Sequence, residues 1–243
     1  MAARQNTVKY MGSKNRIAKH ILPIILKDRK PGQIYYEPLV GGANLIDKVD
    51  GERVGADSNK YIAAMWFHLS NGWVMPENVD KDLYKHIKNN KHEYLNHVVG
   101  WVGIACSYSG KWFGGFAGKV ETKSGLRDYQ AEAVANVKKQ IPGIIGVEFI
   151  HSHYKDLEIK PYSIIYCDPP YANTTKYKDD FNHAEFWQWC RDKANRGHQV
   201  FISEYNAPND FVCLWEKEVK SSLSANGKSG SNKNSVERLF TYK

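Results

Sequence analysis

Residues 33–49 read QIYYEPLVGGANLIDKV. The apolar beginning of this stretch, residues 34–36, predicts a short buried strand, and the glycine pair at 41–42 predicts a tight turn. The residues that follow, 43–49, predict the start of a helix. A strand that passes through a glycine turn into a helix is typical of the first half of a nucleotide-binding βαβ unit.

The next stretch, ERVGADSN at residues 52–59, supplies the second half of such a unit. It predicts another short strand that ends at Asp57, and a helical pattern follows over residues 60–69. The order of these features matches that of nucleotide-binding α/β proteins: a strand, a glycine turn, a helix, a second strand and an acidic residue. The sequence therefore predicts an α/β fold.

The alternation of strands and helices returns in the second half of the chain. Strands are expected at residues 147–150, 163–167 and 199–203, with a helix at 183–195. Two closing stretches, 212–219 and 236–243, flank a loop rich in Ser, Gly, Asn and Lys and predict a β-hairpin with a long tip. Between the two halves, helical patterns cover residues 79–96 and 130–140, and Pro142 is expected to end the second of these helices.

Composition narrows the class of protein. The 243 residues are 42% hydrophobic and 25% charged, which is typical of a globular chain. Lys and Arg exceed Asp and Glu by 34 to 26, a net charge of +8, and this excess favours a polyanionic partner such as nucleic acid. No apolar run is long enough to span a membrane and the N-terminus lacks an apolar signal core, so neither membrane insertion nor secretion is expected. The four cysteines lie far apart, which favours reduced thiols in a cytoplasmic protein.

Residues 100–143 interrupt the strand–helix alternation. The segment GIACSYSGKWFGGFAGKVETKSGLRDYQ, residues 103–130, is rich in glycine, aromatic and basic residues, and it is too long for an ordinary connection. Basic side chains suit phosphates, whereas aromatic side chains suit stacking on an opened base pair. For Trp112 and Phe116, a small aromatic core beneath a long loop explains the pattern equally well.

The most specific feature is the stretch Ile164-Ile165-Tyr166-Cys167-Asp168-Pro169-Pro170-Tyr171. An apolar strand delivers an acid, two prolines and an aromatic residue at its carboxyl end, where open α/β sheets bind ligands. The prolines have no N–H, so the site gains carbonyl acceptors without competing donors. A carboxylate, a carbonyl and a flat ring suit the exocyclic amino group of a planar base. An Asp-Pro turn that only ends a strand is the simpler alternative.

Four blocks in order resemble the Dam-like, alpha-class family of N6-adenine DNA methyltransferases, which use S-adenosylmethionine. The blocks are Lys9-Tyr10-Met11-Gly12-Ser13-Lys14, Glu37-Pro38-Leu39-Val40-Gly41-Gly42, Asp57-Ser58-Asn59 and Asp168-Pro169-Pro170-Tyr171. The resemblance implies a Rossmann-like methyltransferase fold, with a mixed seven-stranded sheet and an inserted target-recognition region. It implies a catalytic domain of residues 1–75 and 144–243 and a recognition region of residues 76–143.

The resemblance also assigns roles to individual residues. The catalytic motif is Asp168, Pro169, Pro170 and Tyr171. The expected cofactor-binding residues are Tyr10, Lys14, Glu37, Pro38, Gly41, Gly42, Asp57, Phe149, Ile150 and Asp168. Within this set, Gly41 and Gly42 are expected to let the backbone approach the cofactor, and Asp57 to accept hydrogen bonds from its ribose. The family often has a third glycine where this chain has Ala43, which is expected to stiffen the loop.

The expected DNA-binding residues all belong to the aromatic and basic segment: Tyr108, Lys111, Trp112, Lys119, Lys123 and Arg127. The implied reaction transfers a methyl group to adenine N6 in double-stranded DNA after base flipping, without a metal. The pair His151 and His153 is expected to lie at the surface rather than to bind a metal. The implied enzyme acts in the cytoplasm of a bacterial or phage-infected cell, as a monomer or weak dimer. DNA methylation of the restriction-modification type is implied, and the small chain favours an enzyme without a partner endonuclease.

Three other functions stay open at this point. The same chemistry suits adenine in RNA or the side-chain amide of a protein glutamine, although the glutamine enzymes usually carry Asn in place of Asp168. A catalytically idle methyltransferase fold that only binds DNA is the third. The intact catalytic motif and the basic recognition segment favour the DNA methyltransferase.

Overall fold

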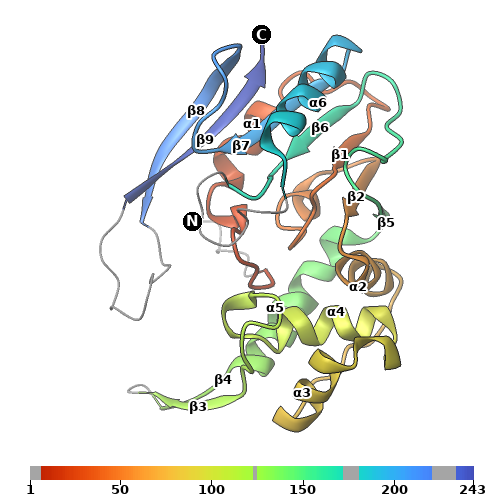
Figure 1. Cartoon of the computed structure of the whole chain (residues 1–243), viewed down its shortest axis with the longest axis vertical. Coiled ribbons are helices and arrows are strands. Elements are labelled where there is room, and N and C mark those ends of the chain that lie inside the picture. The colour runs from red at the N-terminus through yellow and green to blue at the C-terminus, as the bar shows by residue number, and fades with distance from the viewer. Residues whose placement is uncertain (1–6, 123–124, 172–180, 221–233) are drawn as a thin grey trace. The chain divides into compact units, whose positions relative to one another are not determined.

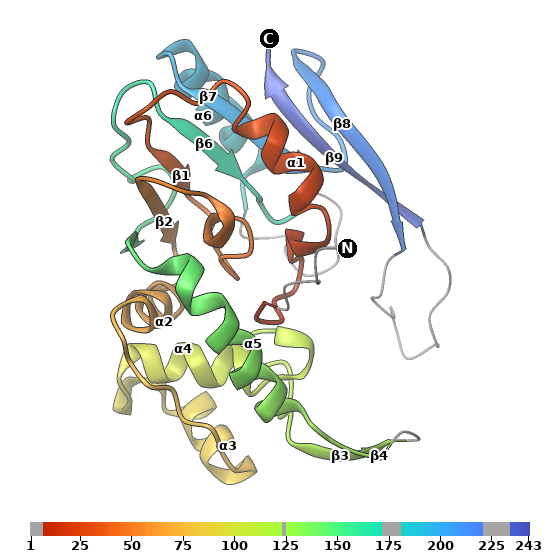
Figure 2. The same ribbon diagram turned by 180° about the vertical axis from the view of Figure 1, so that it is seen from behind.

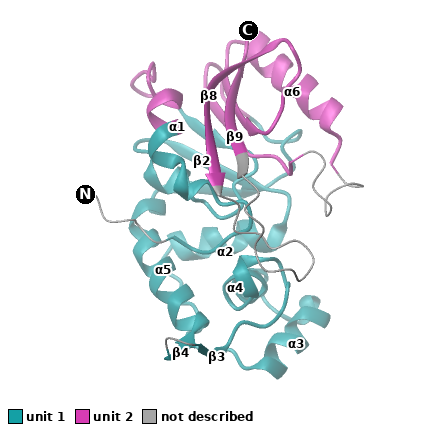
Figure 3. Ribbon diagram, turned by 90° about the vertical axis from the view of Figure 1, so that its left-hand side faces the viewer, with its two compact units in different colours: residues 1–20, 34–158 teal, residues 21–33, 159–243 magenta. Residues whose placement is uncertain are grey.

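The computed structural model describes residues 7–122, 125–171, 181–220 and 234–243 of the chain. These residues form two compact units (Figure 3). Unit 1 comprises Met1–His20 and Ile34–Glu158, and unit 2 comprises Ile21–Gln33 and Ile159–Lys243. The division expected from the sequence, at residues 76 and 143, separates a catalytic domain from a recognition region. The two compact units divide the chain at other residues, so the functional division stays a prediction.

The strands form a mixed seven-stranded sheet in the order β5-β2-β1-β6-β7-β9-β8 (Figure 1). In unit 1, β1 (Tyr35–Glu37) pairs in parallel with β2 (Arg53–Asp57), and β2 pairs in parallel with β5 (Val147–His151). In unit 2, β6 (Ile164–Cys167) and β7 (Gln199–Glu204) are parallel. The hairpin of β8 (Phe211–Lys220) and β9 (Asn234–Tyr242) is antiparallel and joins β7 through β9. The expected α/β class with a mixed seven-stranded sheet is confirmed at this level.

Helices supply the rest of both units. Helix α1 (Ala18–Ile25) crosses the boundary between the units, and unit 2 contains α6 (His183–Asn195). Unit 1 contains α2 (Lys60–Ser70), α3 (Lys81–Asn89), α4 (Asn96–Ala105) and α5 (Tyr129–Ile144). It also contains the short hairpin of β3 (Lys119–Thr122) and β4 (Gly125–Asp128). Single 3-10 turns are η1 (Lys14–Arg16), η2 (Ile46–Lys48), η3 (Lys91–Glu93) and η4 (Tyr108–Gly110).

The core of unit 1 is built around α2 and α4. Helix α2 begins where the Asn59 side chain accepts a hydrogen bond from the Tyr61 N–H at 3.0 Å, and it buries one apolar face, including Trp66. Nearly all of α4 is buried. A Cβ at Gly100 of α4 would lie 2.1 Å from the Tyr61 carbonyl oxygen, so only glycine permits this approach of the two helices.

Several expected elements differ from the structure. Residues 43–49 contain only the 3-10 turn η2 rather than a helix start, because Ala43 adopts a left-handed backbone with φ 50°. Helix α5 continues through Pro142 to Ile144. Pro142 has no N–H to donate to the carbonyl of Lys138, four residues earlier, so α5 gives up that hydrogen bond and ends two residues later.

Two elements of the inserted region were not expected at all. Helix α4 has apolar residues on every side and two glycines, so it lacks the one-sided pattern from which helices are predicted. The β3–β4 hairpin is fully exposed along β3 and carries no strong strand pattern. Figures 1 and 2 show this hairpin projecting from the helical part of unit 1.

Candidate functional site

The first group of candidate residues lies in unit 1, on a loop that leaves the carboxyl end of β1. This glycine loop, residues 38–45, runs beside the carboxyl end of the parallel strand β2, where Asp57 stands. One Asp57 oxygen accepts a hydrogen bond from the Gly41 N–H at 3.1 Å, and the other accepts one from the Asn59 N–H at 2.8 Å. The structure therefore brings together Gly41 and Asp57, two of the residues singled out from the sequence.

Burial dominates the electrostatics of Asp57. It raises the pKa of this carboxyl from 3.8 to about 6, against the opposing effects of the Asn59 and Gly41 N–H groups and of His151. Because the side chain is only half-buried, its outer surface remains open to a ligand. A carboxylate with two backbone donors still has free lone pairs for further hydrogen bonds.

The packing of Tyr10 gives a reason for Gly41 and Gly42 other than the expected close approach of a cofactor. A Cβ at Gly41 would lie 2.7 Å from Tyr10 Cε1, and a Cβ at Gly42 would lie 2.6 Å from Tyr10 Cβ. Gly41 also has a left-handed backbone, with φ 46°, and its carbonyl accepts a hydrogen bond from the Trp66 indole at 2.7 Å. The two glycines are therefore required by the packing of Tyr10 over the loop, whatever ligand binds there.

Asn44 closes the same loop and was not singled out from the sequence. Asn44 is 5% exposed, and neither its side-chain nitrogen nor its side-chain oxygen has a hydrogen-bond partner among the described residues. An unpaired buried amide costs about 1–3 kcal/mol. A ligand that offers both a donor and an acceptor would satisfy this side chain.

The other expected cofactor residues make buried contacts. Lys14 is buried and donates to the Gly12 carbonyl at 2.9 Å, and the Glu37 carboxylate accepts a hydrogen bond from the Tyr35 hydroxyl at 2.8 Å. Pro38 is buried beside Glu37. On β5, Phe149 stacks on Trp66 with ring centroids 6.2 Å apart, and Ile150 is half-buried.

The second group of candidate residues lies in unit 2, where Asp168, Pro169, Pro170 and Tyr171 follow β6 directly. All four residues of β6 are buried, so the backbone that leads into this Asp-Pro-Pro-Tyr segment is firmly held. Asp168, Pro170 and Tyr171 are half-buried, and Pro169 is buried. The expected central strand and the segment at its carboxyl end are therefore confirmed.

Tyr171 is held by two residues that the sequence did not reveal. Its hydroxyl donates to the Glu237 carboxylate at 2.7 Å, and its ring meets Tyr205 edge to face, with centroids 4.5 Å apart. Burial, and then the negative charges of Asp168 and Glu237, raise the pKa of Tyr171 well above 10, so this phenol stays neutral. Only the pairing of β9 with β7 places Glu237 here.

Two basic residues expected to bind DNA, Arg127 and Lys119, form ion pairs within the protein. Arg127 donates two hydrogen bonds to Glu132, at 2.5 and 2.9 Å, and Lys9 donates a third at 2.8 Å. Arg127 first, and then Lys9, lower the pKa of Glu132 to about 2. Lys119 lies 3.8 Å from Asp128, and Lys123 falls outside the described residues.

The aromatic residues of the inserted region divide between packing and exposure. Trp112 is half-buried and stacks on Tyr61 with centroids 5.8 Å apart, while Phe116 meets Tyr84 at 5.5 Å. Tyr108 is 59% exposed, and Lys111 beside Trp112 is half-buried. The placement of Trp112 and Phe116 favours the small aromatic core over base contact, whereas Tyr108 remains accessible to a partner.

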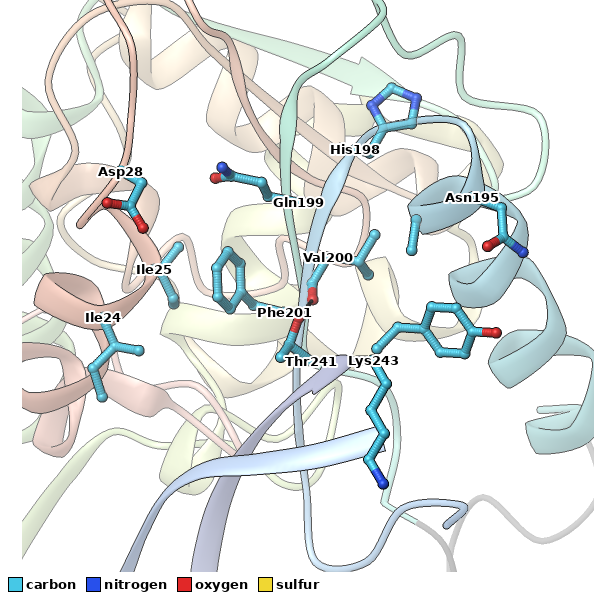
Figure 4. A pocket seen from close by; sticks show the side chains of 12 residues that line it. Ile24, Ile25, Asp28, Asn195, His198, Gln199, Val200, Phe201, Thr241 and Lys243 are labelled. Carbon is cyan, nitrogen blue, oxygen red and sulfur yellow. Dashed lines mark hydrogen bonds between the residues drawn. The ribbon is translucent and has the colours of Figure 1, made fainter. Parts of the chain in front are cut away.

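Unit 2 also contains an open cavity of about 400 Å³ (Figure 4). Ile25 and Phe201 contribute apolar walls, and Asp28, His198 and Lys243 contribute polar ones. The cavity lies at the amino end of β7, whereas the Asp-Pro-Pro-Tyr segment lies at the carboxyl end of the parallel strand β6. None of the site residues expected from the sequence lines it.

Within the described ranges, no group of three His, Cys, Asp or Glu residues could hold a metal ion. His151 is exposed at the end of β5 and approaches the Ser58 carbonyl at 3.2 Å. No helix in the described part of the chain is long and apolar enough to cross a membrane. No protein-family model and no curated protein matches this chain.

Proposed function

We propose that this protein is an S-adenosylmethionine-dependent methyltransferase that modifies N6 of adenine in double-stranded DNA. The observation that carries the proposal is the Asp-Pro-Pro-Tyr segment at the carboxyl end of the buried parallel strand β6. Ligands of open α/β sheets bind at such strand ends. A carboxylate, proline carbonyls and a held aromatic ring match the amino group and the flat face of adenine.

The glycine loop supports the cofactor part of the proposal. Asp57 offers a carboxylate at the end of β2, as suits ribose hydroxyls. Asn44 lies on the same loop, but both polar atoms of its amide are enclosed by the protein, so the support from the loop comes from Asp57. When bound, S-adenosylmethionine supplies a methyl group on a positively charged sulfur.

The chain's own residues orient the target amine. Asp168 and the Pro169 carbonyl accept hydrogen bonds from the two N–H groups of this amine. This arrangement favours a pyramidal nitrogen with its lone pair turned toward the methyl group. Tyr171 stacks on the flipped base. Its neutral hydroxyl is tied to Glu237, so the ring keeps one orientation when the base arrives.

The β3–β4 hairpin supports a macromolecular partner. It exposes Val120 and Leu126, at 48% and 62%, on a thin projection of unit 1. Val120 pairs with Arg127 and Leu126 pairs with Glu121, so the two apolar side chains lie on opposite faces of the hairpin, each beside a charged residue. The described strands carry Lys119 and Arg127 beside Glu121 and Asp128, so the hairpin is assigned to duplex DNA because it projects from unit 1 and not because of a local excess of charge.

The test is methyl transfer from labelled S-adenosylmethionine to unmethylated duplex DNA, with the modified nucleoside identified by mass spectrometry. We expect N6-methyladenine with the wild type and none with Asp168→Ala, which should retain at least part of its binding of S-adenosylhomocysteine. The exposed Asp192→Asn on α6 is the matched control and should methylate normally. Transfer to RNA or to protein glutamine in place of DNA would refute the substrate, and DNA binding without any transfer would identify the idle fold.

A further inference from the structure

Gln140, on α5, joins two parts of the candidate cofactor site. Its side-chain nitrogen donates to the Gly42 carbonyl at 3.0 Å and to the Ala43 carbonyl at 2.9 Å. Its side-chain oxygen accepts a hydrogen bond from the Val8 N–H at 3.0 Å. The residue is 1% exposed, so water does not compete for these bonds. One buried amide thus connects the glycine loop to the N-terminal segment.

The loop needs such a restraint because Ala43 is strained. Its φ of 50° is a left-handed conformation, which is unfavourable for a residue with a Cβ. The strain persists only where surrounding contacts hold the backbone in place. The bonds from Gln140 to the carbonyls of Gly42 and Ala43 are contacts of this kind.

The N-terminal segment forms the other side of the same arrangement. Val8, which Gln140 binds, lies two residues before Tyr10, and the Tyr10 side chain leaves no room for a Cβ at Gly41 or Gly42. Gln140 therefore fixes the loop directly, through its carbonyls, and indirectly, through the segment that carries Tyr10.

Helix α5 gives this residue a firm base. It begins at the root of the β3–β4 hairpin, where Asp128 accepts hydrogen bonds from the N–H groups of Gln130 and Ala131. Figure 2 shows the helix running from that hairpin towards β5. Its first turn also holds Lys9 through Glu132, so the N-terminal segment is bound to α5 at two places.

We propose that Gln140 is a positioning residue that keeps Gly42, Ala43 and the Tyr10 segment in the conformation that binds S-adenosylmethionine. The inference rests on the proposed function. Without the three hydrogen bonds, Ala43 can relax to a negative φ, and only a fraction of the molecules then retains the binding conformation. Apparent affinity falls by that same fraction. Turnover at saturating cofactor is preserved, because Gln140 is 1% exposed and its side chain bonds only backbone groups of Val8, Gly42 and Ala43.

The test compares Gln140→Met with a matched control on the same helix, Gln130→Met. Gln130 is also a buried glutamine that binds backbone, since it accepts from the Val79 N–H and donates to the Val79 carbonyl, both at 2.8 Å, but it does not touch the glycine loop. Calorimetry with S-adenosylhomocysteine should show affinity reduced about 10- to 100-fold in Gln140→Met and changed less than about twofold in Gln130→Met. In steady-state assays, KM for S-adenosylmethionine should rise in Gln140→Met while kcat stays within about threefold of the wild type.

A second variant separates positioning from general loss of stability. Ala43→Gly adopts the left-handed backbone without strain, so adding it to Gln140→Met should restore at least part of the lost affinity. The inference is overturned if Gln140→Met binds normally, if both methionine variants lose affinity equally, or if Ala43→Gly rescues nothing.

Hydrogen exchange distinguishes this inference from the proposed function. Gln140→Met should accelerate amide exchange at Val8 and along residues 41–44, and Gln130→Met should not. If the wild type binds no S-adenosylhomocysteine, the proposed cofactor is wrong, and localised exchange would still support Gln140 as the residue that orders the loop. Exchange that rises evenly over unit 1 would refute the positioning role itself.

Discussion

Replacement of Asp57 by Asn should stabilise the protein at neutral pH while weakening cofactor binding. In the folded protein, burial raises the pKa of Asp57 from 3.8 to about 6. A difference of about 2 pKa units corresponds to about 3 kcal/mol at roughly 1.4 kcal/mol per unit, and this is an upper value because the side chain is half-buried. The ionised carboxylate therefore destabilises the folded state by at most about 3 kcal/mol.

The sign of the pH dependence follows from the direction of the shift. Between pH 3.8 and about 6, the folded protein binds the Asp57 proton more tightly than the unfolded chain does. The free energy of unfolding therefore falls as pH rises through this range, and the full penalty is present above about pH 6. Asn carries no charge at any pH and removes this dependence.

Asn also removes one acceptor. Only one of the N–H groups of Gly41 and Asn59 keeps an oxygen partner, and the lost hydrogen bond costs about 1 kcal/mol. The net expectation at pH 7.5 is a gain in unfolding free energy of up to about 2 kcal/mol, which disappears by about pH 4. Cofactor affinity should fall by about 1.5–3 kcal/mol, because a charged acceptor is lost.

Two measurements check this reasoning. Urea unfolding of the wild type and of Asp57→Asn between pH 4 and 8 gives the stability difference, with Asp156→Asn, an exposed carboxylate of unit 1, as the control for removal of a charge. Calorimetry with S-adenosylhomocysteine should show wild-type affinity rising with pH up to about 6 and levelling above it, while the variant shows no such rise. Parallel stability curves for wild type and Asp57→Asn would refute the raised pKa, and unchanged affinity would remove Asp57 from the cofactor site.

The remaining predictions concern the inserted region and Tyr171. Lys119→Ala should flatten the slope of log affinity for DNA against log salt by about 0.9. Arg127→Ala should change the slope less, because Arg127 makes two hydrogen bonds to Glu132, whereas Lys119 is 63% exposed and lies 3.8 Å from Asp128. Equal slopes for both variants and the wild type would exclude hairpin contact with phosphates. Trp112→Ala should lower stability by about 1–3 kcal/mol in denaturant unfolding, because Trp112 is half-buried. A variant of unchanged stability that loses only methylation would instead support contact of Trp112 with the base. Glu237→Leu should lower kcat when Tyr171 is present but should have no further effect in a Tyr171→Phe background, because Glu237 acts through the Tyr171 hydroxyl. Additive losses of kcat in the double variant would contradict this role of Glu237.

Much of the fold could be predicted from local pattern. The strand and acid around Asp57, the buried strand before Asp168 and the helix at residues 183–195 all follow from runs and periodicities that neighbouring residues define. The carboxyl-end positions of Asp57 and Asp168 follow as well, because each acid comes directly after its strand. These features depend on short stretches of chain, and a single sequence contains that information.

Tertiary structure decided what the loops and polar side chains do. The left-handed Ala43 prevents the helix expected at 43–49, and the bonds that hold it come from Gln140, far along the chain. The hydrogen-bond partner of Tyr171 lies on the last strand, and Trp112 stacks on Tyr61 of α2, about 50 residues earlier in the chain. Contacts between residues distant in sequence depend on how separate elements pack, and no local periodicity records them. The sequence alone therefore determined which strand ends carry the acids, while the packing of α5, β9 and the inserted helices determined what holds the loop and the aromatic ring in place.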